Sequence, residues 1–181
     1  YFITLNQWFD ETLLNENLKS IGNMELNCNI KEYKNNKKPI FFVAANEKYF
    51  NLFFEKLANS IWQKSPNQRI HLHLMLERED TLSVLKSKVS AKFSFSSELY
   101  QPHGKTGYTI RRFYRLYQLT KFLNCPILLA DIDLVCTQDP TSLFDKLGGC
   151  DVGIILRPFE AVINQQVLAS LFSINPSERG L

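Results

Sequence analysis

Two aspartates with one residue between them follow an apolar run in the segment "ILLADIDLV". The run Ile127–Ala130 predicts a buried strand, and Asp131 and Asp133 stand at its carboxyl end. Residues i and i+2 of an extended chain share a side, so both carboxylates can reach one hard cation while Ile132 faces away. Such a pair suits Mg²⁺ or Mn²⁺ bound together with the phosphate oxygens of a substrate. The structural alternative is that either aspartate caps the next helix or pairs with an arginine.

Three arginines lie on the helix predicted just before this strand. In "YTIRRFYRLYQLTKFL", Arg111, Arg112 and Arg115 occupy adjacent turns. Guanidinium groups fork onto phosphate oxygens, so a basic helix beside a metal-binding strand end predicts a diphosphate clamp. The alternative for each arginine is a solvated face that balances nearby acids.

The histidines do not predict a second metal site. His71 and His73 share one face of a predicted strand, but no third ligand stands at a suitable spacing, so packed or surface histidines are the favoured interpretation. His103 lies in the loop "HGKTG", whose spacing differs from that of a Walker loop. Neither G-x-S-x-G nor G-x-G-x-x-G occurs, so hydride transfer and serine hydrolysis have no support.

An alternation of strands and helices must position these residues. "PIFFVAA" is typical of a strand covered on both faces, and the apolar stripe of "NEKYFNLFFEKLANSIWQK" predicts a helix that ends before Pro66. The strand "RIHLHLML" completes a βαβ unit, which implies parallel strands. Further strands are expected at residues 92–97, 126–135, 151–156 and 167–174, and further helices at 78–89, 108–123 and 140–149. The predicted fold class is α/β, with a mostly parallel central sheet flanked by helices.

The organised sequence begins at Ile40. Residues 1–39 contain a helical candidate around Leu5 to Leu18 and then "KEYKNNKKP", which is typical of a solvated linker. The predicted division is therefore an N-terminal helical and linker segment, 1–39, and a domain over 40–181. Because the chain starts with Tyr1 rather than methionine, we expect it to be a piece of a longer protein with further domains.

Composition narrows the class of partner. The 181 residues carry a net charge of +3 from 21 basic and 18 acidic residues, a bias too weak and too scattered to indicate nucleic-acid binding. The four cysteines form no C-x-x-C pair, so we expect reduced, mostly buried thiols. The sequence contains neither a run of roughly 18 to 20 apolar residues nor a signal-peptide pattern, so no membrane span is predicted and a cytoplasmic domain is expected.

Taken in order over residues 39–181, these segments resemble glycosyltransferases of the GT-A fold. The group it is most similar to is the retaining group related to glycogenin and bacterial lipopolysaccharide galactosyltransferases. "FFVAANEKYFNLFFEKLANSI" resembles the family's first strand and helix, "YTIRRFYRLYQL" its tyrosine and Arg-Phe helix, and "ILLADIDLVCTQDPTSLF" its metal motif with the following helix. The resemblance implies a Rossmann-like, nucleotide-sugar-binding domain.

The resemblance also implies roles for eight residues. The nucleotide pocket would be lined by Ala44, Asn46 and Tyr49, the nucleotide or diphosphate contacted by Tyr108, Arg112 and Arg115, and Mn²⁺ or Mg²⁺ ligated by Asp131 and Asp133. The implied activity is metal-dependent transfer of a hexose from a nucleotide-diphosphate sugar, expected to be a UDP-sugar, to an unidentified glycan, lipid or protein acceptor. The metal would neutralise charge on the departing diphosphate.

The sequence departs from the family's pattern in two places. Asn46 stands where an aspartate is common, and no histidine follows His103 to serve as the family's C-terminal metal ligand. The family also continues beyond the position of Leu181, so the domain is expected to be incomplete at its C-terminal end.

Two other functions remain open from the sequence. One is a catalytically inactive or regulatory domain that binds a nucleotide sugar or a partner. The other is a phosphohydrolase similar to haloacid dehalogenases, in which Asp131 would be the nucleophile and Asp133 the acid/base.

Overall fold

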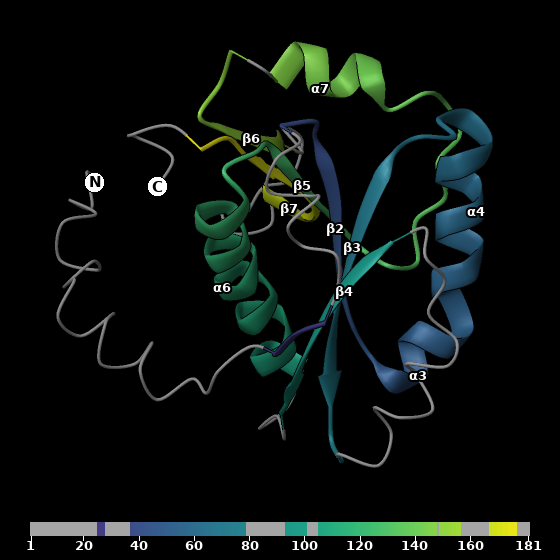
Figure 1. Ribbon diagram of the computed structural model, residues 1–181, viewed down its shortest axis with the longest axis vertical. Coiled ribbons are helices and arrows are strands. Elements are labelled where there is room, and N and C mark those ends of the chain that lie inside the picture. Colours follow the sequence, from purple (N-terminus) through teal and green to yellow (C-terminus); the bar gives the residue numbers. More distant parts are fainter. Residues whose placement is uncertain are drawn as a thin grey trace, which may run out of the picture.

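Four parallel strands form the centre of a seven-stranded sheet (Figure 1). The computed structural model describes residues 25–27, 37–78, 93–100, 105–147, 149–156 and 167–176. Strand β2 (Ile40–Asn46) pairs in parallel with β3 (Arg69–Leu76) and with β5 (Ile127–Ala130), and β4 (Ser94–Leu99) pairs in parallel with β3. The predicted α/β class with a mostly parallel sheet is confirmed.

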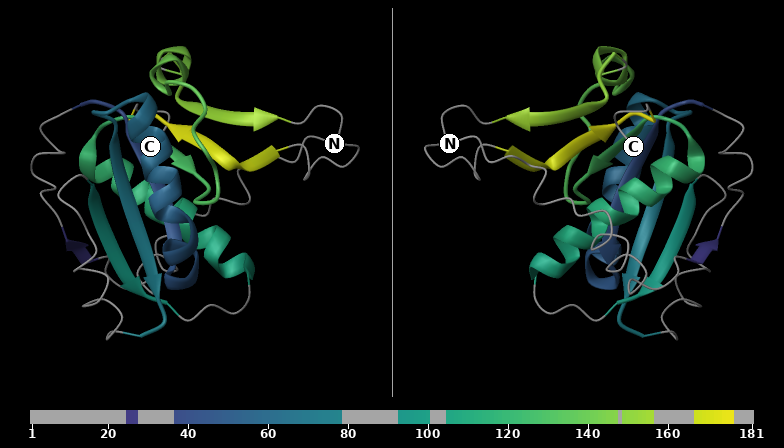
Figure 2. Two further views of the ribbon diagram at one scale, coloured as in Figure 1. Left: turned by 90° about the vertical axis from the view of Figure 1, so that its right-hand side faces the viewer. Right: turned by 90° about the vertical axis from the view of Figure 1, so that its left-hand side faces the viewer.

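Antiparallel strands complete both edges, in the order β1-β4-β3-β2-β5-β7-β6. Strand β7 (Val167–Ile174) pairs with β5, and β6 (Val152–Leu156) pairs with β7. These two strands extend away from the parallel part (Figure 2). Both were predicted. Strand β1 (Glu25–Asn27), which pairs with β4, was not, because three residues are too few to show an alternating pattern.

Helices cover both faces of the parallel strands (Figure 1). The helix predicted after β2 is present as three consecutive pieces, α3 (Glu47–Tyr49), the π-helical turn η2 (Phe50–Phe54) and α4 (Glu55–Lys64). Helix α6 (Lys105–Leu123) begins three residues before the predicted start, and α7 (Thr141–Leu147) lies within its predicted range.

Each face of the sheet has its own core. On the face of η2, α4 and α7, buried residues of the strands pack against these helices, and the rings of Phe41 and Phe144 meet edge to face. On the opposite face, Ile40, Phe42, Ile127 and Leu129 pack against α6 through Leu116, Leu119 and Leu123. The alternation of side chains along each strand produces this division.

The α6 face changes character across the sheet. It is apolar on β2 and β5, but on β3 and β4 its buried residues other than Met75 are polar: His71, His73, Ser94, Ser96 and Glu98. The unequal faces predicted for β3 are therefore present, and its two histidines are packed rather than exposed.

Some predictions fall outside the described residues, namely the helix around residues 5–18, the helix at 78–89 beyond Arg78, and His103. In the part that is described, no helix has both the length and the apolar character needed to cross a bilayer. The described cysteines are free thiols: Cys125 is buried, Cys136 is partly buried and Cys150 is exposed.

Candidate functional site

A cavity of about 610 Å³ opens at the carboxyl ends of β2, β3 and β5. Strand order reverses at β2, whose neighbours β3 and β5 lie on opposite sides, and open α/β sheets bind ligands at such a point. The cavity is lined by Ala44, Ala45, Asn46, Lys48, Tyr49, Met75, Tyr108, Thr109, Arg112, Asp131, Ile132 and Asp133. Of the eight residues singled out in the sequence, all except Arg115 are in this lining.

The two aspartates lie in a turn rather than on the strand. Strand β5 ends at Ala130, and the amide of Leu134 donates a 3.4 Å hydrogen bond to the carbonyl of Asp131. Ile132 is buried in the core, and it also borders the cavity between the two aspartates. Asp131 and Asp133 still line one cavity. The turn replaces the extended geometry that the sequence suggested, and the chain places both side chains at the same edge.

An ion pair joins the arginine helix to the first aspartate. Nη1 of Arg112, on α6, donates to Oδ1 of Asp131, and both side chains are partly exposed in the cavity wall. The ion-pair alternative for Asp131 is therefore realised. A guanidinium and a carboxylate that meet in a cavity can also serve ligands of opposite sign, a diphosphate and a cation.

Polar and aromatic groups form the wall on the side of β2. Asn46 is the last residue of β2 and the N-cap of α3, where its Oδ1 accepts a 2.9 Å hydrogen bond from the amide of Tyr49. The Tyr108 hydroxyl donates to Oε1 of Glu77 at 3.3 Å, and burial raises the pKa of Tyr108, which keeps this hydroxyl protonated. Asn46 also presents its amide to the cavity, so this wall offers both donors and acceptors.

Arg115 points away from the cavity. Its side chain is fully buried, where Nη2 donates to Oε2 of Glu98 and Nη1 donates to Oε1 of Gln118 at 2.6 Å. Arg111 also reaches Glu98, through Nε at 2.9 Å and Nη2 at 2.8 Å. The sequence did not identify Glu98. The available signal was the alternation of Ser94, Ser96 and Glu98 opposite the predicted histidine strand.

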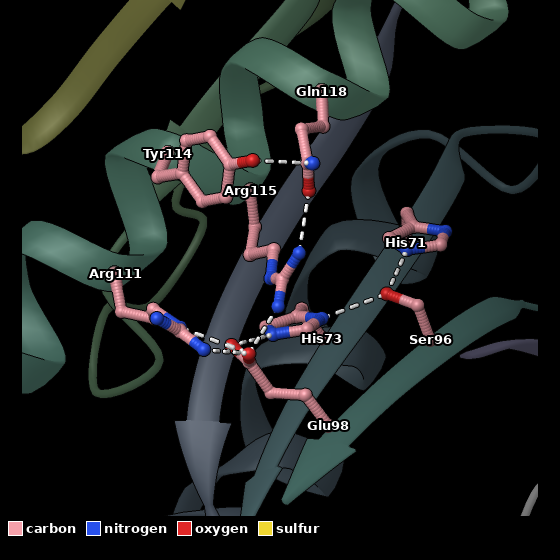
Figure 3. A network of polar contacts seen from close by, with 8 residues as sticks. All are labelled: His71, His73, Ser96, Glu98, Arg111, Tyr114, Arg115 and Gln118. Atoms are coloured by element: carbon pink, nitrogen blue, oxygen red, sulfur yellow. Dashed lines mark hydrogen bonds and ion pairs between the residues drawn. The ribbon is translucent and has the colours of Figure 1, made fainter. Parts of the chain in front are cut away.

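A chain of hydrogen bonds links Glu98 to both histidines (Figure 3). Burial alone would raise the pKa of Glu98, but hydrogen bonds from His73, Arg115 and Arg111 hold that pKa well below its ordinary value. The ionised carboxylate only accepts, so Nε2 of His73 is the donor of the 3.0 Å bond to Oε1.

The directions of the other hydrogen bonds follow from the neutral state of the two histidines. Burial lowers the pKa of His73, and it lowers the pKa of His71 to about 3, with a smaller contribution from the charge of His73. Nδ1 of His73 then accepts from the hydroxyl of Ser96 at 2.8 Å, whose oxygen accepts from Nε2 of His71 at 2.9 Å. Nδ1 of His71 in turn accepts from the hydroxyl of Ser94 at 2.7 Å. Both histidines are therefore Nε2–H tautomers.

The donor set of the cavity fits a hard cation that shares its ligands with a substrate. Within the described ranges, no three His, Cys, Asp or Glu side chains come together as a complete metal site. Asp131 and Asp133 supply two carboxylates. Mg²⁺ and Mn²⁺ are bound in this way when substrate phosphates and water provide the remaining oxygens.

Solved structures share this fold. The galactosyltransferase LgtC, in complex with donor and acceptor sugar analogs, superposes with a TM-score of 0.54 at 17% sequence identity, over 79% of this chain and 59% of that chain. The glycosyltransferase GlyE of Streptococcus pneumoniae TIGR4 superposes with a TM-score of 0.53 at 20% identity, over 80% of this chain and 36% of that chain. No protein-family model and no curated protein matches the sequence.

These similarities concern the fold, because the sequence identities are low. The chain spans 59% of the length of LgtC and 36% of the length of GlyE. Both neighbours are glycosyltransferases, as the resemblance of the sequence implied. This chain has the GT-A fold of glycosyltransferases.

Proposed function

We propose that this chain forms the donor-binding part of a metal-dependent glycosyltransferase that takes a hexose from a UDP-sugar. One observation carries the proposal: Asp131, Asp133 and Arg112 line the same cavity as Asn46 and Tyr108, at the point where strand order reverses. Carboxylates for a cation, a guanidinium for a diphosphate and a polar wall for a nucleotide are the groups that a nucleotide sugar requires.

The aspartates would hold Mn²⁺ or Mg²⁺, which when bound supplies positive charge to the departing diphosphate. Arg112 donates hydrogen bonds to a diphosphate oxygen and so stabilises the charge that grows there. The fold similarity to LgtC and GlyE supports a transferase over the phosphohydrolase alternative.

The nucleotide is expected to lie along Ala44, Asn46 and Tyr49. The side chain of Tyr49 is half-exposed at the mouth of the cavity, where its ring can pack on a base, and the amide of Asn46 can pair with a base edge. The acceptor is a glycan, lipid or protein whose identity the cavity leaves open.

Calorimetric titration tests the proposal. UDP-glucose, UDP-galactose, ADP-glucose and GDP-mannose are titrated into the chain, each with Mn²⁺ and each with EDTA. We expect a UDP-sugar to bind with Mn²⁺ and to lose at least about tenfold in affinity with EDTA, since the cation bridges donor and aspartates. Equal affinity with EDTA would remove the metal from the proposal, and no affinity for any of the four donors would reject it.

A further inference from the structure

Glu98 is a buried carboxylate that three side chains from two elements contact. Its side chain is 2% exposed, and it accepts hydrogen bonds from Arg111 and Arg115 on α6 and from His73 on β3 (Figure 3). An unpaired carboxylate in this place would be strongly unfavourable, and so would two arginines without a counter-charge. The group is stable only as an assembled unit of β3, β4 and α6.

This unit attaches the helix that lines the cavity. Arg111 and Arg115 are one turn apart on α6, and both reach Glu98 at the end of β4. Arg112, one residue after Arg111, reaches Asp131 after β5. Strands β3 and β2 lie between these two attachment points in the sheet. Helix α6 is thus held across the sheet by carboxylates on both of its sides.

Two attachment points on different sides of a helix determine its rotation about its own axis. Successive residues of an α-helix point about 100° apart, so Arg111 and Arg112 face different carboxylates. The cavity residues Tyr108 and Thr109 belong to the turn that precedes these arginines. Any rotation of α6 that released Glu98 would therefore also move Tyr108, Thr109 and Arg112 relative to Asp131.

We infer that Glu98 is a positioning residue for the donor site: through Arg111 and Arg115 it sets the rotation of α6 and so presents Arg112 and Tyr108 to the diphosphate. This inference rests on the proposed function, because it names what Glu98 does for that same site. It also gives Arg115 a role as an anchor of α6 rather than as a contact of the donor.

Glu98→Gln is the most direct variant, because the amide has nearly the same shape as the carboxylate. It carries no charge to balance the arginines, and its NH₂ group is a donor facing other donors. Ser94→Ala is the matched control, since it removes a buried hydrogen bond from the same strand and the same face but at the other end of the strand from Glu98.

The first readout is the affinity for UDP in the presence of Mn²⁺, measured by calorimetry at pH 7. We expect Glu98→Gln to weaken binding by at least about tenfold, as a displaced contact group does, and Ser94→Ala to change it by less than about twofold. An equal loss in both variants would overturn the inference, because it would reflect lower stability alone.

A double-mutant cycle separates positioning from direct contact. In the background of Arg112→Met, the effect of Glu98→Gln is expected to fall below about threefold, because the group that Glu98 positions is absent. An undiminished, additive effect would contradict action through Arg112. If Glu98→Gln does not fold, Arg111→Gln replaces it, with an expected loss of at least about threefold from the removal of one charge-assisted anchor.

Hydrogen exchange without ligand separates this inference from the proposed function. If the wild type binds no UDP, the proposed function fails, and the amides of residues 108–112 still report on α6. Faster exchange there in Glu98→Gln than in Ser94→Ala supports the positioning of α6 by Glu98. Equal exchange in the two variants rejects it, whatever the chain binds.

Discussion

Arg112 and Asp131 form an ion pair inside the cavity that is proposed to take up a cation and a diphosphate. The same contact has two consequences for binding. It occupies a carboxylate that the cation needs, and it holds the guanidinium away from the anion. When a metal and a nucleotide diphosphate bind, Asp131 would exchange the guanidinium for the cation, and Arg112 would exchange the carboxylate for the diphosphate.

The variant Arg112→Met tests this exchange. Without the guanidinium, Asp131 is free for a cation, so the affinity for Mn²⁺ alone is expected to rise about fivefold, which corresponds to about 1 kcal/mol for a partly exposed ion pair. The affinity for UDP with Mn²⁺ is expected to fall at least about tenfold, because a charge-assisted hydrogen bond is lost.

Both affinities are measured by calorimetry, with Lys121→Met as the control. This substitution removes the same charge from the far end of α6, where the exposed lysine lies over the ring of Tyr117. The control is expected to leave both affinities unchanged. A fall in the affinity for Mn²⁺ alone in Arg112→Met would contradict the exchange.

At the scale of the elements, α7 and the β6–β7 hairpin pack at one glycine. A Cβ on Gly153 would lie against Oγ of Ser173 and 2.6 Å from Cδ2 of Leu147. Ser173 is buried on β7, and Leu147, the last residue of α7, is partly buried against the core, so a Cβ here would force one of these side chains to shift. The close approach of strand and helix therefore favours a residue without a side chain at position 153.

Gly153→Ala is expected to lower the free energy of unfolding by about 1–3 kcal/mol, the usual cost of forcing extra volume into a packed place. Gly149→Ala is the control, since a Cβ there meets nothing within 4 Å, and it is expected to change stability by less than about 0.5 kcal/mol. Urea denaturation measures both. Equal stability of the two variants would show that α7 does not pack on the hairpin as described.

The contact between α6 and the polar half of the sheet makes a spectroscopic prediction. Because ionised Glu98 fixes the direction of the hydrogen-bond chain, His73 and His71 are both expected as neutral Nε2–H tautomers at pH 7. Their ¹⁵N chemical shifts distinguish this state from the Nδ1–H tautomer and from the cation. A protonated His73 would contradict the neutral chain of donors and acceptors.

At the scale of the whole molecule, these buried groups couple stability to pH. The pKa of His71 is about 3 in the folded chain against an ordinary value of 6.5, and burial lowers that of His73 as well. As pH falls below about 6.5, the unfolded chain binds protons that the folded chain does not. The free energy of unfolding should then fall by about 1.4 kcal/mol per pH unit for His71, and His73 should add to this fall.

Glu98 adds to this loss at lower pH. Its folded pKa lies below the ordinary value of 4.5, so its contribution is present above that value and is lost as pH falls further. Urea denaturation at pH 7.5, 6.5, 5.5 and 4.5 gives the slope, and His71→Gln is expected to remove one histidine's share of it. A stability that stays constant between pH 6.5 and 4.5 would contradict the burial of neutral histidines.

The sequence predicted the sheet and the edge at which the cavity lies, for physical reasons. Apolar runs and stripes depend on local periodicity, and ligands bind beyond the carboxyl ends of parallel strands, so Asp131 and Asp133 were expected at a ligand site. Asn46 was expected there only from the resemblance to glycosyltransferases. The sequence did not show which way each arginine side chain points. Arg111 and Arg112 are neighbours, so what each of them meets depends on how α6 is rotated about its axis. Glu98 was missed because its partners depend on register between strands, such as the pairing of Met75 with Glu98.

Asp131 and Asp133 are proposed to hold a cation against a nucleotide diphosphate. Crystals grown with Mn²⁺ and UDP, with anomalous data collected at the manganese edge, test it most directly. We predict an anomalous peak within about 2.0–2.3 Å of an oxygen from each aspartate and of diphosphate oxygens, with Arg112 turned from Asp131 to the diphosphate. UDP bound in the cavity with manganese elsewhere, or with Arg112 still on Asp131, would contradict it.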